Sequence, residues 1–262
     1  MSEKRGKYSK VKVGDARTIF EQELARRKLS FQRTADGRYA LELRGGQLTV
    51  SLENIARDFE RDHDATAITR FVERCMASAA VPGWGTARNW VYFSAEPSDH
   101  EFGDTLRTRV TDTVTRVLVV TDAEETKVTW LTPAQQKKWK VKVAELEHAA
   151  GKNLDALLHG KKLEVTEAAG KKLGMIPVAS AFKASLIFAP GFRKFVEPEM
   201  GWPVLAVIPC RDFIYVLAEA DRDLLGRMGV VVQREFSGSG YPITKEVLRV
   251  SDDGIEAIGT FP

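Results

Sequence analysis

The hydrophobic pattern is strongest in residues 201–216, which read GWPVLAVIPCRDFIYV. An apolar run over 204–208 is followed by the turn residues 209–212 and by a second apolar run over 213–217. β-Branched and aromatic residues bounded by proline, glycine and aspartate predict the two strands of a hairpin. The first strand is apolar enough to be buried on both faces, so we expect this hairpin to form part of the core.

Alternating apolar and polar residues, or short apolar runs, predict further strands. They lie at residues 39–43, 48–52, 90–93, 114–120, 127–131, 163–166, 173–176, 230–236 and 248–250. Turn residues separate several of them into hairpins. The sequence therefore predicts mainly antiparallel pairing.

Apolar residues with a period of about 3.6 predict the helices. They cover residues 16–28, a segment directly after Ser51, and residues 65–79, 134–139, 143–158, 179–195 and 221–228. Asp15 is expected to cap the first, and Thr132 followed by Pro133 is a strong start signal for the fourth. Gly151 weakens the helix over 143–158, which leaves two shorter pieces as an alternative.

Strands followed directly by helices recur at residues 39–63, 116–140 and 203–228. This order predicts an α+β fold. Either the three segments are copies of one ββα unit, or they share this order by chance, because hairpins followed by helices are common. We expect two subdomains, at residues 14–112 and 113–262. Residues 1–13 are basic and read as a flexible tail or as an arm that touches nucleic acid or an acidic partner.

The composition of the chain is that of a globular protein. The chain has 262 residues, of which 44% are hydrophobic and 29% charged, with a net charge of +3, as in ordinary globular proteins. Its amino terminus has no apolar signal-like segment, and no apolar run approaches the ~20 residues that a membrane span requires. We expect a cytoplasmic protein that does not bind membranes, in which Cys75 and Cys210 are free, buried or half-buried thiols.

Several strings in this order resemble the uncharacterised YtpQ-like family of bacterial proteins, a domain of unknown function. They include LTVSLENIARDF, VLVVTDAEETKVTWLTPAQQKKWKV, KASLIFAPGF, WPVLAVIPCRDFIYVL and YPITKEVLRVSDDG. The resemblance covers about residues 39–250. It implies a bacterial cytoplasmic protein and supplies no catalytic residues.

Motifs for catalysis, metals or cofactors are weak. The four histidines lack the spacing of a zinc site, and residues 237–240 lack the Lys-Ser/Thr of a phosphate loop. Cys210 has no histidine beside it, so a nucleophilic thiol is disfavoured. We expect Arg211 and Asp212 to serve the turn, or Arg211 to serve recognition at a sheet edge. We name no catalytic residue, metal or cofactor.

Two groups of aromatic and basic residues are candidates for binding. Four lysines surround Trp139, namely Lys137, Lys138, Lys140 and Lys142. They form either a nucleic-acid surface or a solvated helix face with Trp139 in the core. The connector over 81–105 carries Trp84, Trp90, Tyr92, Phe93 and Phe102, which form either an exposed contact patch or a loop folded onto its own domain.

These observations favour a non-enzymatic protein-interaction or adaptor module that acts through a sheet edge or the Trp-rich connector. Nucleic-acid binding through the basic tail and the segment 137–142 is the first alternative. A small-molecule enzyme whose site is assembled from dispersed residues is the second. The predicted contact residues are Trp84, Trp90, Arg211, Asp212, Lys138 and Lys140, and the oligomeric state stays open.

Overall fold

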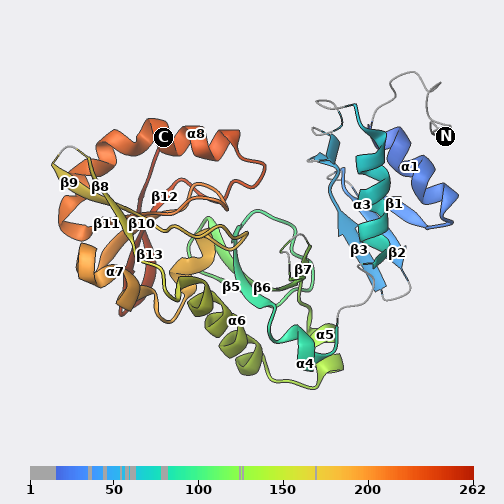
Figure 1. Cartoon of the computed structure of the whole chain (residues 1–262), viewed down its shortest axis with the longest axis horizontal. Coiled ribbons are helices and arrows are strands. Elements are labelled where there is room, and N and C mark those ends of the chain that lie inside the picture. The colour runs from blue at the N-terminus through green and yellow to red at the C-terminus, as the bar shows by residue number, and fades with distance from the viewer. Residues whose placement is uncertain are drawn as a thin grey trace, which may run out of the picture. The chain divides into compact units, whose positions relative to one another are not determined.

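The computed structural model describes residues 16–34, 37–43, 46–53, 55–56, 59, 63–77, 82–123, 125, 127–168 and 170–262. The chain divides into two compact units, Met1–Val81 and Pro82–Pro262. Helices and three antiparallel sheets form the described parts of these units, which confirms the α+β class (Figure 1). The predicted tail, the Asp15 cap and much of the helix after Ser51 lie outside the described residues.

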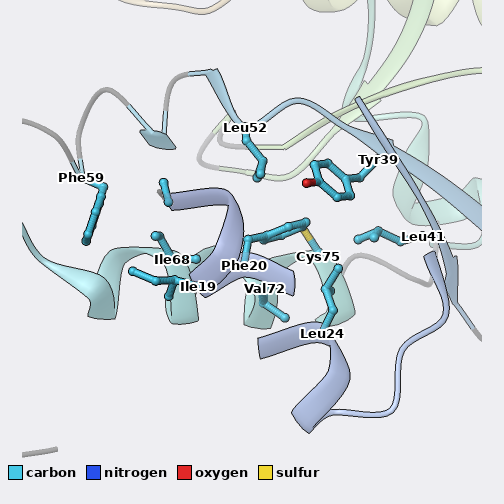
Figure 2. Close-up of a cluster of buried hydrophobic side chains, with 11 residues drawn as sticks. Ile19, Phe20, Leu24, Tyr39, Leu41, Leu52, Phe59, Ile68, Val72 and Cys75 are labelled. Atoms are coloured by element: carbon cyan, nitrogen blue, oxygen red, sulfur yellow. The ribbon is translucent and has the colours of Figure 1, made fainter. Parts of the chain in front are cut away.

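The first unit contains a three-stranded sheet in the order β1-β2-β3. Its elements are β1 (Phe31–Arg33), β2 (Tyr39–Leu43), β3 (Gly46–Val50), α1 (Ala16–Arg26) and α3 (Ala65–Ala77). Figure 2 shows the core of this unit, where side chains from both helices meet Tyr39 and Leu41 of the sheet. Ile68, Val72 and Cys75 contribute from α3 at helical spacing, as the sequence predicts.

The second unit contains a six-stranded antiparallel sheet in the order β13-β12-β10-β11-β9-β8. Its strands are β8 (Glu164–Ala168), β9 (Lys171–Met175), β10 (Val204–Val207), β11 (Tyr215–Ala218), β12 (Glu246–Ser251) and β13 (Gly254–Thr260). Every residue of β10 is buried, and β10 pairs with β11 and β12 on its two sides. The prediction of a core hairpin around residues 204–217 is therefore confirmed.

The second unit also contains a four-stranded sheet, in which β6 (Val114–Thr121) is the central strand. It pairs with β4 (Val91–Pro97), β5 (Arg107–Arg109) and β7 (Val128–Trp130). Because β4 and β5 are partners of β6, residues 82–112 belong to the second unit. The structure thus places the division at 81/82 rather than at the predicted 112/113.

The helices of the second unit are α4 (Trp84–Ala87), α5 (Pro133–Trp139), α6 (Val143–Leu158), α7 (Phe192–Met200) and α8 (Leu225–Gly238), with the 3₁₀ helices η1 (Ala184–Phe188) and η2 (Glu219–Leu224). Helix α4 was not predicted, and the predicted helix over 179–195 is divided between η1 and α7. The Thr132 hydroxyl accepts a hydrogen bond from the Gln135 amide at 3.2 Å, which confirms the predicted cap. Helix α6 continues through Gly151, so the two-piece alternative is wrong.

In the last 35 residues one prediction is wrong and one strand was missed. Residues 230–236 form part of α8, and its buried Met228 and Val232, four residues apart, face the same core cluster as Leu205 of β10. The apolar run over 230–232 suggested a strand, but Val230 is 84% exposed, whereas Val232 is buried. Strand β13 was not predicted, because its sequence GIEAIGT alternates weakly.

The ββα order is observed at β6-β7-α5 and at β10-β11-η2-α8, although these hairpins belong to different sheets. The helix of the third predicted copy, at 39–63, lies largely outside the described residues. Whether the units are true repeats stays a prediction.

Candidate functional site

The candidate site lies at the turn between β10 and β11, and backbone hydrogen bonds hold this turn on two sides. The Arg211 amide donates to the Tyr241 carbonyl at 3.1 Å, and the Ile243 amide donates to the Pro209 carbonyl at 2.9 Å. On another side, the Ala184 amide donates to the Arg211 carbonyl at 3.1 Å. Segments far apart in the sequence therefore fix the backbone from which Arg211 projects.

The Arg211 side chain stacks on the ring of Tyr241. Its Cζ lies 3.8 Å from the ring centroid, within the range of a cation–π interaction. Tyr241 is 45% exposed and the Arg211 side chain is 33% exposed. The pair therefore presents a cation and an aromatic ring together at the surface.

The guanidinium of Arg211 has no hydrogen-bond acceptor among the described residues. Its Nε is buried without a hydrogen-bond partner, and it forms a long ion pair with Oδ1 of Asp212 at 3.6 Å, beyond hydrogen-bond distance. Among the half-buried arginines of the described residues, Arg27, Arg116 and Arg249 each donate to a carboxylate. Arg211 thus differs from them, because it donates no hydrogen bond to a carboxylate within the described residues.

The expectation that Arg211 lies at a sheet edge is wrong. Strands β10 and β11 occupy the middle of the six-stranded sheet, so Arg211 lies at the end of two central strands. Its stacking partner Tyr241 was not identified from the sequence. The only signal for Tyr241 was its position after the Gly- and Ser-rich residues 237–240.

The Trp-rich connector is folded onto its own unit. Its aromatic side chains include three that are buried: Tyr92, Phe93 and Phe102. The Tyr92 ring stacks on Phe182 with centroids 4.3 Å apart, and burial raises the pKa of Tyr92. Trp84 and Trp90 are half-buried, which favours the folded-back alternative over an exposed aromatic patch.

The lysine-rich segment 137–142 has its aromatic residue in the core. Trp139 is buried, and its Nε1 donates to the Pro82 carbonyl at 2.9 Å. Lys138 and Lys140 are exposed on either side of it. Trp84 packs on Trp139 with ring centroids 5.5 Å apart, so the structure brings Trp84 beside the segment that carries these lysines.

The structure describes both thiols and two small surface hollows. Cys75 and Cys210 are both free and buried, which confirms that prediction. Two hollows of the described surface, with volumes of about 120 and 90 Å³, are lined by other residues and are smaller than the ~300 Å³ typical of ligand pockets. No group of three or more His, Cys, Asp or Glu suited to a metal ion occurs within the described ranges.

These observations define an α+β protein in which backbone hydrogen bonds hold an arginine–tyrosine pair at a turn. Comparison with protein-family models, curated proteins and solved structures finds no match. The resemblance to the YtpQ-like family therefore stays a prediction. Among the described helices, none has the length and apolar character needed to cross a bilayer.

Proposed function

We propose that this chain is a protein-interaction module of adaptor type, and that Arg211 and Tyr241 form the centre of its contact surface. The observation that supports this proposal is a half-buried arginine that lies on an exposed tyrosine ring while its buried Nε lacks a hydrogen-bond partner. Arginine and tyrosine are enriched among the residues that dominate binding energy at protein interfaces. A partner that covers this pair would supply acceptors to the terminal guanidinium nitrogens, which donate no hydrogen bond within the described residues.

The geometry also lowers the cost of binding. An interface side chain loses about 0.5–1.5 kcal/mol of rotamer freedom when a partner immobilises it. Stacking on Tyr241 and the hydrogen-bonded turn already restrict Arg211 before a partner arrives. We therefore place the contact surface at this turn, rather than at a sheet edge or the Trp-rich connector.

Affinity capture from a lysate of the source organism tests this proposal. The tagged chain is compared with Arg211→Ala and Tyr241→Ala, with and without nuclease, and bound proteins are quantified by mass spectrometry. We expect a stoichiometric protein partner that survives nuclease treatment. If Arg211 and Tyr241 each contribute 2 kcal/mol or more to binding, each substitution should reduce the partner's affinity at least about 30-fold.

Two controls accompany this experiment. Arg227→Ala removes an exposed arginine on α8 and should capture the partner like the unaltered chain. Lys138→Glu with Lys140→Glu tests the nucleic-acid alternative, in which binding weakens steeply as salt rises and all partners are lost with nuclease. Equal capture by the Arg211 and Arg227 variants, or recovery of the protein alone, would contradict the proposed function.

A further inference from the structure

We infer that Arg211 binds the carboxylate of an acidic side chain on the protein partner. This inference rests on the proposed function and adds the chemistry of the partner to it. Its basis is the set of guanidinium donors that the fold leaves open, together with the charges that surround them.

The Arg211 side chain is one-third exposed, and its terminal nitrogens are the donors that we assign to the partner. A guanidinium has five N–H donors in one plane, and one of its faces is covered here by the Tyr241 ring at 3.8 Å. The Nε is buried, with Asp212 at 3.6 Å, so a partner approaches the two terminal nitrogens. Two parallel N–H donors at this end match the two oxygens of a carboxylate.

The local charge favours a carboxylate over a phosphate. In the described part of the chain, the charged group in contact with Arg211 is Asp212, and the two side chains together carry no net charge. A phosphate monoester carries about −1.5 to −2 charges at neutral pH and is typically bound by a cluster of arginines. One arginine with an adjacent aspartate is suited to a group with a single negative charge.

The first test observes the arginine side-chain ¹⁵N signals of the full chain by NMR. Arg211→Lys assigns the signal by its disappearance, and the probe is a capped Gly-Gly-Glu-Gly-Gly peptide. We expect saturable shifts of the Arg211 signal at millimolar peptide, and no shift with the matched Gly-Gly-Gln-Gly-Gly peptide. A response to the glutamine peptide equal to that of the glutamate peptide would overturn the inference.

Variants at the site separate recognition from a purely structural role. Asp212→Asn removes a like charge near the incoming carboxylate and should tighten binding of the glutamate peptide about 2–5-fold, whereas a structural role of Arg211 predicts no such gain. Tyr241→Ala frees the guanidinium and should weaken binding at least about 5-fold. Unchanged affinity in both variants would contradict the inference.

Phosphate is tested as the competing chemistry. A capped peptide with phosphoserine in place of glutamate, and inorganic phosphate alone, are titrated under the same conditions. Tighter binding of either at the Arg211 signal would overturn the carboxylate assignment.

The outcomes distinguish the inference from the function on which it rests. If capture of the partner depends on Arg211 but the glutamate peptide leaves its signal unmoved, the interaction module stands and the carboxylate inference is wrong. If the peptide shifts the signal but capture is the same without Arg211, the carboxylate site stands and the proposed function is wrong.

Discussion

At the scale of single residues, the first unit contains a buried carboxylate held by two arginines. The Glu23 side chain is 2% exposed and accepts hydrogen bonds from Arg26 at 2.5 Å and from Arg27 at 2.7 Å. The bond from Arg26 is the main cause that lowers the pKa of Glu23 from 4.5 to about 2, against the opposing effect of burial. The charged form of Glu23 is therefore stabilised by folding.

This pKa difference predicts how stability depends on pH. A carboxyl group with a lowered pKa in the folded state stabilises the protein above pH 4.5, and its contribution is lost as the pH falls towards 2. Glu23→Gln should lower the free energy of unfolding of the first unit by about 2–3 kcal/mol at pH 7. The difference from the unaltered chain should shrink towards zero near pH 2.

Hydrogen exchange of backbone amides in α1 and β2 measures this effect. Fluorescence provides a control, because all five tryptophans lie in the second unit and their unfolding transition should not change. Equal amide protection in Glu23→Gln and in the unaltered chain at pH 7 would show that the ion pair does not stabilise the fold.

A second titrating residue of this unit is Tyr39. Its burial, together with the hydrogen bond that its hydroxyl donates to Glu21 at 2.5 Å, raises its pKa to about 12. Tyr39 should therefore stay protonated where an exposed tyrosine ionises, near pH 10.

At the scale of elements, α6 shows how packing overrides helix propensity. Glycine within a helix costs about 1 kcal/mol relative to alanine, which made residue 151 a candidate break. A Cβ at Gly151 would lie 3.0 Å from Cγ and 3.2 Å from Cδ of Pro190. The glycine permits close approach of the Pro190 ring, and this contact explains why the helix tolerates it.

Substitution of this glycine should therefore destabilise the second unit. Gly151→Val would press two methyl groups towards a rigid ring, and we expect a loss of about 1–3 kcal/mol, as is usual for overpacking. Denaturant unfolding followed by tryptophan fluorescence measures this loss.

Gly229 of α8 is the matched control. A Cβ there would lie 3.7 Å from the Phe261 ring, an ordinary contact, so Gly229→Ala should gain up to about 1 kcal/mol. If Gly151→Val were as stable as the unaltered chain, contact with Pro190 would not be the reason for the glycine.

At the scale of the whole molecule, the two units have separate hydrophobic cores. The described core of the first unit consists of side chains from α1, the three-stranded sheet, α3 and the segment between them. The second unit has its own sheets and its own cluster beneath α8. Each unit should therefore fold without the other.

Expression of residues 82–262 alone tests this independence. Because this fragment contains all five tryptophans, its emission spectrum and its denaturation midpoint should match those of the full chain. A fragment without a cooperative unfolding transition would show that the second unit requires the first.

The sequence by itself determined the features that depend on neighbouring residues. The hairpin around residues 204–217, the cap at Thr132 and the apolar face of α3 follow from periods and hydrogen bonds that span only a few positions. At the site, these local signals also identified Arg211 and Asp212 as turn residues. They did not identify the aromatic partner of Arg211.

Only the tertiary structure decided the features that depend on distant contacts. Val230 belongs to a helix because Met228 and Val232 bury against strands formed elsewhere in the chain, and the central position of β10 follows from pairing with β12. In the same way, Tyr241 lies against Arg211, 30 positions away, because backbone hydrogen bonds join two remote segments. Local patterns do not encode such contacts, since burial and stacking depend on which remote residues meet in the folded chain.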